Sequence, residues 1–143
     1  MSVEQYKKEV GMMNLENLIE ARESISHASF PIPDKELLKR FENLYTGAIN
    51  DVLREFCLLD QALPGRILPL REYRTVAGFA FTVKSAPNVK ITGEMDFRTQ
   101  MLESMKEDDF VIWDTSRDNK ATLWGGVMTA TAKGKKVKAA CID

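Results

Sequence analysis

Residues 109–143 constrain the fold more than any other part of the chain, because they read in order as a strand, a polar loop, a helix and a second strand. Residues 110–113 are apolar without interruption, which is typical of a strand buried on both faces. A helical run, residues 127–133, follows the loop, and an apolar stretch, residues 137–142, follows the helix. This order predicts a βαβ unit in a parallel sheet, and therefore an α/β fold.

An acidic residue stands where each of these strands should end, Asp114 after the first and Asp143 after the second. Ligands of open α/β sheets bind just outside the carboxyl ends of the strands, and parallel neighbours bring these ends to one edge. Two carboxylates there suit Mg²⁺ or Mn²⁺, which prefer oxygen ligands. The alternative for Asp114 is to cap the loop or the helix that follows, and for Asp143 a structural role is favoured.

The predicted helix begins after Trp124-Gly125-Gly126. Small residues there let backbone N–H groups approach an anion, and the helix dipole favours negative charge, so a carboxylate or phosphate is a candidate ligand. A Gly-Gly pair equally serves turn geometry or close helix–strand packing. The segment matches neither the Walker A pattern nor the dinucleotide fingerprint. Arg117, in the preceding loop, is a candidate partner for a substrate carboxylate, the alternative being an ordinary surface arginine.

The composition favours one soluble globular domain. The chain has 143 residues, of which 44% are hydrophobic and 29% charged. A net charge of −1 gives no electrostatic basis for binding nucleic acid. Four lysines within residues 133–138 are expected to offset the dipole of a helix C-terminus. No apolar run approaches the roughly 20 residues of a membrane span and the start lacks a signal-peptide pattern, so we expect no membrane partner and a cytoplasmic location.

Cysteine and histidine offer little for chemistry. Cys57 and Cys141 form no CxxC pair and are expected to be buried reduced thiols. His27 is the one histidine and lies in the N-terminal arm, so a nucleophile–histidine pair would require that arm to fold over the core.

The rest of the chain divides at a proline segment. Residues 1–33 are predicted to be a helical arm and linker that ends at Pro31-Ile32-Pro33, and residues 34–143 one domain. We expect a strand of a mixed sheet over residues 76–84, from its alternation. Three helices are predicted with Asp34, Thr46 and Asp96 as N-caps. Their inner faces would be Leu37, Leu38, Phe41 and Leu44; Ile49, Val52, Leu53 and Phe56; and Phe97, Met101, Leu102 and Met105.

Five segments together carry a family resemblance. They are residues 44–53 (LYTGAINDVL), 66–70 (RILPL), 76–84 (VAGFAFTVK), 108–114 (DDFVIWD) and 123–133 (LWGGVMTATAK) continuing through 140–143 (ACID). In order and spacing they resemble the RraA-like family, which includes RraA, the protein regulator of ribonuclease E, and the 4-hydroxy-4-methyl-2-oxoglutarate aldolases. The resemblance covers about residues 34–143.

The resemblance implies a swivelling β/β/α fold and a trimeric or hexameric assembly with sites between subunits. In the enzyme branch it implies a divalent metal that stabilises a pyruvate enolate, the metal taking up charge that develops on the keto oxygen. The loop after Asp114 and the amides of Gly125, Gly126 and Val127 would receive the pyruvate carboxylate.

Two departures from the aldolases shape the functional expectation. In that branch the strand matching residues 139–143 continues into a Gly-Gly-x-Arg-Asp motif that supplies a substrate-binding Arg and a metal-binding Asp, and an acidic residue tends to stand at the position of Gly126. We therefore expect an incomplete domain, truncated at its C-terminal side or degenerate. A full-length form is expected to be a metal-dependent aldolase or oxaloacetate decarboxylase, with this chain alone inactive. The alternative is a non-catalytic regulator of ribonuclease E or another partner.

Overall fold

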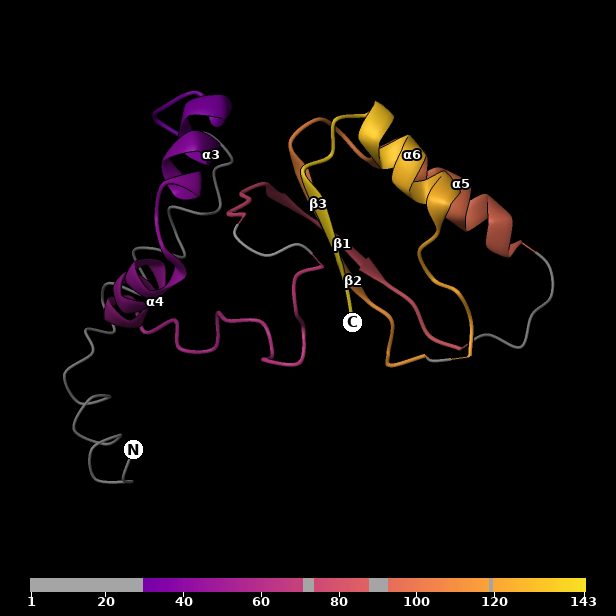
Figure 1. The fold of residues 1–143 in the computed structure, drawn as a ribbon, viewed down its shortest axis with the longest axis horizontal. Coiled ribbons are helices and arrows are strands. Elements are labelled where there is room, and N and C mark those ends of the chain that lie inside the picture. Colours follow the sequence, from indigo (N-terminus) through magenta and orange to yellow (C-terminus); the bar gives the residue numbers. More distant parts are fainter. Residues whose placement is uncertain (1–29, 71–73, 88–92, 119) are drawn as a thin grey trace, which may run out of the picture. The chain divides into compact units, whose positions relative to one another are not determined.

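The computed structural model describes residues 30–70, 74–87, 93–118 and 120–143 (Figure 1). The chain divides into two compact units, Met1–Arg66 and Ile67–Asp143. His27 and the predicted N-terminal helix, apart from Phe30, lie outside the described residues. The predicted boundary after residue 33 stays a prediction.

The described part of the first unit contains two helices, α3 (Asp34–Glu42) and α4 (Thr46–Glu55). The predicted inner face of α3 is confirmed at Leu38, which is 5% exposed. The predicted inner faces are wrong at Phe41 and Leu44 of the first predicted helix and at Val52 of α4, because more than a third of each of these residues is exposed. The apolar stripes of this unit are thus only partly covered.

Both helices begin one residue earlier than the sequence predicts. Asp34 and Thr46 are the first helical residues, and Pro33 and Tyr45 hold the cap positions without a side-chain cap hydrogen bond. The Pro33 carbonyl accepts the Glu36 N–H at 2.9 Å, so it opens the hydrogen-bond ladder of α3. Asp34 instead places its carboxylate in the first turn, where the helix dipole favours negative charge.

The second unit is built on a three-stranded sheet of β1 (Phe79–Lys84), β2 (Asp109–Asp114) and β3 (Ala139–Ile142) in that order. Both pairs of neighbours are parallel, so the predicted α/β fold and βαβ unit are confirmed. The expectation of a mixed sheet is wrong for the described strands, since a helical connection returns the chain to the same end each time. The swivelling β/β/α arrangement stays a prediction.

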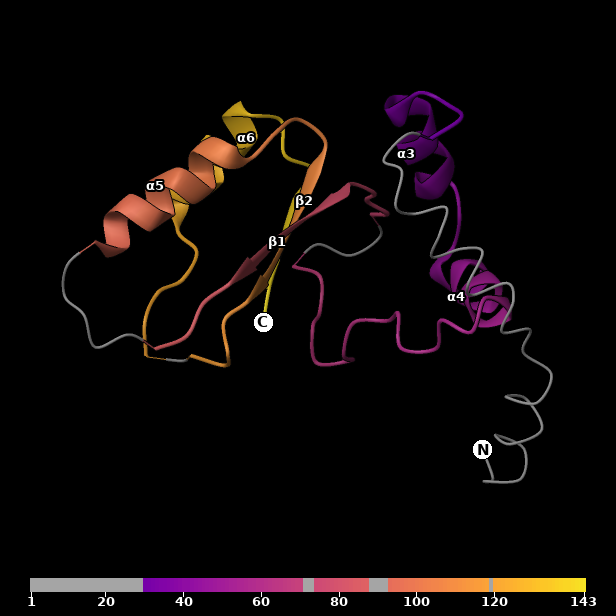
Figure 2. The ribbon, with the colours of Figure 1, turned by 180° about the vertical axis from the view of Figure 1, so that it is seen from behind.

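Two helices cover one face of this sheet. α5 (Glu94–Ser104) joins β1 to β2, and α6 (Gly126–Gly134) joins β2 to β3. They lie together on one side of the sheet in both views (Figures 1 and 2). Asp96 is not the N-cap of α5; Gly93 is, with a φ of 88° that a residue without a Cβ adopts readily.

The core of the second unit lies between these helices and the sheet. It centres on Met105, Val111 and Ala132, with partly buried neighbours from α5, from β1 and from the loops before and after α6. Of the predicted inner face of α5, Met105 is buried and Met101 and Leu102 pack against the core, but Phe97 is 73% exposed. The other partly buried hydrophobic residues of this cluster are Phe81, Val83, Trp124 and Val137.

Lysines that follow α6 contact the end of α5 and the turn before β2. Lys135 Nζ donates to the carbonyls of Glu103 at 2.5 Å and Met105 at 3.1 Å. The ammonium thus sits at the C-terminal end of α5, where the helix dipole favours a cation. Two further lysines make ion pairs across the same turn: Lys136 with Glu107 at 3.5 Å and Lys138 with Asp108 at 3.4 Å.

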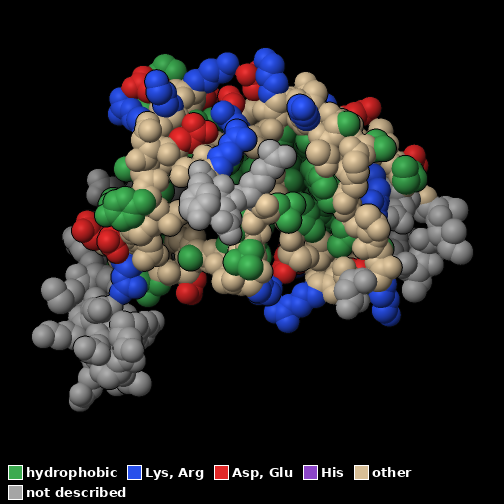
Figure 3. Space-filling view, viewed as in Figure 1, with side chains coloured by type: hydrophobic (Ala, Val, Ile, Leu, Met, Phe, Trp, Pro, Cys, Tyr) green, Lys and Arg blue, Asp and Glu red, His purple; other side chains and the backbone are tan. Residues whose placement is uncertain are grey.

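Charges of both signs are spread over the face shown in Figure 3, without a large area of one sign. Among the residues that the structure describes, no helix is long and apolar enough to cross a membrane.

We predict that Gly78→Ala destabilises the protein by about 1–3 kcal/mol, because overpacking a close contact forces the backbone to shift. A Cβ at Gly78 would lie 2.9 Å from the Asp108 carbonyl oxygen and 2.9 Å from Phe110 Cβ. Gly65→Ala is the matched control, since its Cβ would meet nothing within 4 Å. Urea denaturation should show a lower free energy of unfolding for Gly78→Ala alone, and equal values for both variants would contradict the expectation.

Candidate functional site

The carboxyl ends of the three strands form one polar edge. Asp114 is the last residue of β2 and is in register with Lys84, the last residue of β1. Asp143 follows β3, and its N–H donates to the Trp113 carbonyl at 3.1 Å. The prediction that Asp114 and Asp143 share an edge is therefore confirmed.

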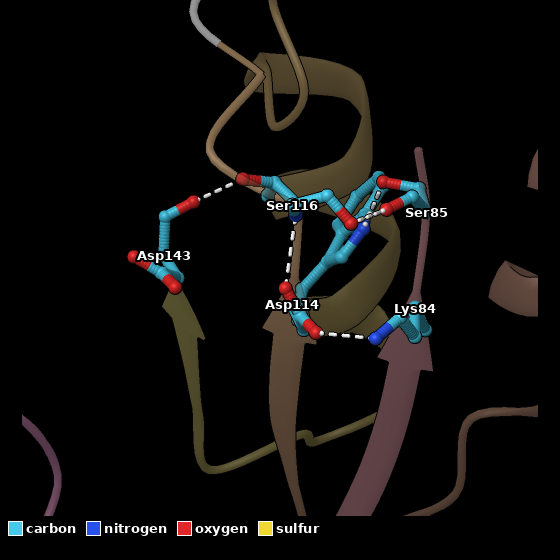
Figure 4. A network of polar contacts seen from close by, with 7 residues as sticks. Lys84, Ser85, Asp114, Ser116 and Asp143 are labelled. Carbon is cyan, nitrogen blue, oxygen red and sulfur yellow. Dashed lines mark hydrogen bonds and ion pairs between the residues drawn. The ribbon is translucent and has the colours of Figure 1, made fainter. Parts of the chain in front are cut away.

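Both carboxylate oxygens of Asp114 have partners (Figure 4). Oδ1 accepts the Ser116 N–H at 2.9 Å, and Oδ2 lies 3.0 Å from Lys84 Nζ. The Ser116 hydrogen bond and then the Lys84 ammonium lower the pKa of Asp114 from its ordinary value of 3.8. Asp114 thus caps the loop, as one of the two predicted roles requires, and it remains a carboxylate at neutral pH.

The loop after Asp114 starts with a tight turn that holds Arg117. Ser116 and Arg117 have φ values of 55° and 57°, and the Asp118 N–H donates to the Thr115 carbonyl at 3.2 Å. Positive φ at both central residues is the pattern of a type I′ turn, which usually needs Gly, Asn or Asp. Arg117 itself is exposed at the surface of the turn.

Contacts to both neighbouring strands hold this turn in place. The Ser116 hydroxyl donates to the Ser85 carbonyl at 2.8 Å, and the fully buried Thr115 hydroxyl donates to the Asp143 carbonyl. Ser85 completes the network, since its N–H donates to the Asp114 carbonyl and its hydroxyl accepts the Trp113 indole N–H, each at 2.9 Å. The turn is therefore fixed to the sheet rather than held by local sequence alone.

The sequence reasoning missed Lys84 and Ser85. The signal was present, because Lys84 is the charged residue at the end of a strand, by the same argument that selects Asp114. It went unused because the mixed-sheet prediction did not place the end of β1 beside that of β2. The parallel pairing does so, and Lys84 becomes the direct partner of Asp114.

The N-terminus of α6 belongs to the same edge by topology, because a helix between parallel strands starts at their carboxyl ends. Gly125 is the N-cap with extended backbone, and the helix has neither a side-chain cap hydrogen bond nor an acidic residue in its first turn. The amides of Gly126 and Val127 are in that first turn, where helical N–H groups lack intrahelical acceptors. Val127 is 78% exposed.

The structure tests two of the three roles suggested for the Gly125-Gly126 pair, namely turn geometry and close helix–strand packing. Neither glycine has a positive φ, and a Cβ at either one would meet nothing within 4 Å. Turn geometry and close helix–strand packing therefore do not require these glycines in the described structure. Binding of an anion by Gly125, Gly126 and Val127 remains a prediction, as does its pairing with Arg117.

The cysteines are less buried than predicted. Cys57 and Cys141 are both half-buried and form no disulfide. Burial raises the pKa of the Cys141 thiol, and the nearby Asp143 carboxylate raises it further. This direction opposes the thiolate that a reactive cysteine needs, in agreement with a structural role for Cys141.

The comparisons with known proteins settle the family. A family model, RraA-like: Aldolase/RraA, matches residues 46–143. The chain belongs to the RraA-like family. No protein among those with curated descriptions matches this RraA-like chain.

One solved structure matches the RraA-like chain with 80% sequence identity and a TM-score of 0.79. It is described as "Crystal structure of novel cellulases from microbes associated with the gut ecosystem". The match covers 96% of this chain and 62% of the solved chain. This chain thus spans less than two thirds of that similar protein.

In its enzyme branch, the family resemblance implies a divalent metal, and the described residues supply only part of a ligand set for it. Asp114 and Asp143 supply carboxyl groups at one edge, of the kind Mg²⁺ and Mn²⁺ prefer. One of the two Asp114 oxygens already faces the Lys84 ammonium, however. Within residues 30–70, 74–87, 93–118 and 120–143, no group of three or more His, Cys, Asp or Glu side chains is placed to hold a metal. These residues alone do not complete a metal site.

Acid should remove the stabilising effect of Asp114. Because the folded-state pKa lies below 3.8, the ionised group stabilises the fold above that value, and this contribution is lost as the pH falls through the folded-state pKa. The stability difference between wild type and Asp114→Asn should therefore be constant from about pH 6 to 8 and shrink in acid. Denaturant unfolding measured across this range tests it, with the exposed Asp60→Asn as control. A difference that grows on acidification would contradict the expectation.

Because the backbone at Arg117 is left-handed, we predict that two uncharged substitutions there change the free energy of unfolding by different amounts. Arg117→Asn should leave the free energy of unfolding within about 0.5 kcal/mol of wild type, because Asn tolerates positive φ. Arg117→Val should lower it by about 1–2 kcal/mol, because a β-branched residue is strained there. Both variants lose the same charge, so urea denaturation isolates the backbone effect. Arg74→Val, at an exposed residue without positive φ, should cost less than Arg117→Val.

Proposed function

We propose that this RraA-like protein, in a form that carries a complete site, is a divalent-metal-dependent lyase acting on pyruvate-derived keto acids. The reactions are those of a 4-hydroxy-4-methyl-2-oxoglutarate aldolase or an oxaloacetate decarboxylase. The observation that carries the proposal is the match of residues 46–143 to a family model whose description names aldolases. The polar edge formed by Asp114, Asp143 and the start of α6 supports it.

The residues of this chain would bind and orient the substrate. The N–H groups of the N-cap Gly125 and of Gly126 and Val127 in the first turn of α6 would donate to the substrate carboxylate, with the helix dipole favouring its charge. Arg117 would be a second, bidentate partner for that carboxylate. The lowered pKa keeps Asp114 ionised near neutrality, so its role would be to hold a cation rather than to donate a proton.

A metal, when bound, would supply Lewis-acid stabilisation of the charge that develops on the keto oxygen. Asp114 is the proposed contribution of this chain, with Mg²⁺ or Mn²⁺ as the ion. Since the described residues give only a partial ligand set, we propose that this chain alone is inactive and that a longer form supplies the remaining ligands.

The polar edge can also be compared with the active site of a cellulase, because the description of the similar solved structure names cellulases. A glycosidase needs two carboxyl groups, one of them with a raised pKa so that it can protonate the leaving group. Asp114 has a lowered pKa, which is the opposite direction. Asp114 therefore does not suit the acid role of a glycosidase.

A non-catalytic role as a regulator of ribonuclease E or another partner is the second candidate. The observation that favours it is the lack, within the described part of the chain, of three clustered metal-binding side chains. We further propose a trimeric or hexameric assembly and a cytoplasmic location. Purified ribonuclease E that binds the protein and loses activity on binding would favour the regulatory role over the lyase.

The lyase proposal predicts Mg²⁺-dependent release of pyruvate. The assay measures pyruvate from 4-hydroxy-4-methyl-2-oxoglutarate and from oxaloacetate, with and without a chelator, on this chain and on a longer form. We expect turnover by the longer form only. Replacing the equivalent of Asp114 by Asn should lower kcat/KM by about 10–100-fold, the usual effect of losing a group that binds or supports a metal.

Asp60→Asn is the control for a general loss of an aspartate, and it should leave kcat/KM unchanged. The same preparations are tested for release of reducing sugar from cellulose. A longer form that releases no pyruvate from either keto acid would rule out the proposed lyase. Release of sugar without pyruvate would favour a glycosidase instead.

A further inference from the structure

The second unit contains a cavity of about 530 Å³ beside the polar edge. A volume of this size is within the range of roughly 300–1,000 Å³ that small-molecule sites usually have. Its walls come from the end of β1 and the loop after it, from α5, from the end of β2 and from the loop before α6. All of these elements belong to the second unit, so the cavity is complete within it.

Two aromatic side chains line the cavity, one enclosed and one open to solvent. Trp113 is 4% exposed, and an edge contact to Trp124, with the ring centroids 6.4 Å apart, helps to hold its ring. Phe97 lines the same cavity but is 73% exposed. An enclosed aromatic surface with a second aromatic side chain nearer to solvent suits a ligand that has a planar ring.

The charged groups of the wall favour a ligand without charge. Lys84 is paired with Asp114, and Arg98 both donates to the Leu123 carbonyl at 3.4 Å and makes a further interaction. Both cations of the wall are thus engaged, and an anionic ligand would also face the Asp118 carboxylate. A cationic ligand would meet Lys84 and Arg98, two charges of its own sign.

Two polar groups of the wall keep hydrogen-bonding capacity. The Ser85 hydroxyl accepts the Trp113 indole N–H at 2.9 Å, and among the described residues its own O–H has no acceptor. Asp118 Oδ1 accepts the Lys120 N–H at 2.9 Å, whereas Oδ2 has no donor in the described part of the chain. The hydrogen bond from the Ser116 hydroxyl to the Ser85 carbonyl fixes the start of the turn that carries Asp118 beside Ser85. The wall therefore offers a ligand one donor and one acceptor.

We propose that this cavity binds a small neutral molecule that carries a planar ring and a primary carboxamide. The ring lies against Trp113 and Phe97, the amide N–H donates to Asp118 Oδ2, and the amide carbonyl accepts from the Ser85 hydroxyl. A carboxamide supplies a donor and an acceptor together without a net charge. Binding needs neither a metal nor keto-acid chemistry, so this inference and the lyase proposal can each fail without the other.

The test is equilibrium binding of naphthalene-2-carboxamide to this chain at neutral pH, measured by calorimetry. We expect saturable binding of one molecule per chain. Methyl 2-naphthyl ketone keeps the ring and the carbonyl but has no N–H, so it should bind at least about tenfold more weakly, because a hydrogen bond to a charged acceptor is lost. 2-Naphthoate has nearly the same shape but carries a negative charge toward Asp118, and it should also bind at least about tenfold more weakly. Acetamide, which lacks the ring, should show a similar or larger loss.

Substitutions locate the binding, and Asp118→Asn does so with little change in shape. The Asn carbonyl oxygen can still accept the Lys120 N–H, which turns an NH₂ group toward the ligand, and this group cannot accept the amide N–H. The Kd for the amide should rise at least about tenfold, and its preference over the ketone should fall to about threefold or less. Ala121→Trp should abolish binding by filling the cavity, and it keeps the test valid if Asp118→Asn fails to fold. Asp60→Asn, at an exposed residue outside the lining, should leave the Kd unchanged.

Three results would overturn the proposal. The first is an absence of saturable binding by naphthalene-2-carboxamide, and the second is an equal affinity for the ketone or for 2-naphthoate. The third is an unchanged Kd in a folded Asp118→Asn or Ala121→Trp variant, which would place any binding elsewhere.

Discussion

The contacts of the candidate site depend on the in-register parallel pairing of β1 with β2. Six residues of β1 pair with six of β2, from Phe79 opposite Asp109 to Lys84 opposite Asp114. Because the two strands end together, an ammonium and a carboxylate meet at the edge. Ser85 then extends the ladder by one hydrogen bond to the Asp114 carbonyl. A slip of one residue would turn Lys84 to the other face of the sheet and break the network.

At this edge the Asp114 carboxylate and the first turn of α6, which favours a bound anion, belong to the same end of the sheet. Asp114 is stabilised by the Ser116 amide and by Lys84, while the first turn of α6 carries no acidic side chain. Thr115 and Ser116 are tied to Asp143 after β3 and to Ser85 after β1, which fixes the start of the loop that leads to α6. The pyruvate moiety of the proposed keto-acid substrates, a carboxylate beside a polarisable keto oxygen, would match such an arrangement of charge.

The sequence predicted the strand at residues 110–113, the acid at its end and the parallel order of the last two strands, because an unbroken apolar run and its period carry that information. It misplaced the caps of three helices. Asp34 and Thr46 are good caps by type, but a proline carbonyl and an extended tyrosine hold those positions. The stripe that includes Phe97 satisfied the helical period, yet that period does not show how far a short sheet extends beneath the helix.

Other features of the site are beyond local patterns. The left-handed pair Ser116-Arg117 contains no Gly, Asn or Asp, and contacts from Ser85 and Asp143, distant in sequence, add to the local hydrogen bond to Asp114 in holding it. Lys84 became part of the site through pairing between strands rather than through any motif. The amides at Gly125 and Gly126 could be predicted, because a helix start after a strand has a direction fixed by topology.

The short strand β3 is fastened at both of its ends. Before it, the Lys138 N–H donates to the Asp109 carbonyl at 2.8 Å, and after it the Asp143 N–H donates to Trp113 while the buried Thr115 hydroxyl binds the Asp143 carbonyl. A four-residue strand at a sheet margin would ordinarily fray from its tip. Here fraying must first break a buried contact, so β3 is expected to detach as a whole and to carry Asp143 away from the polar edge.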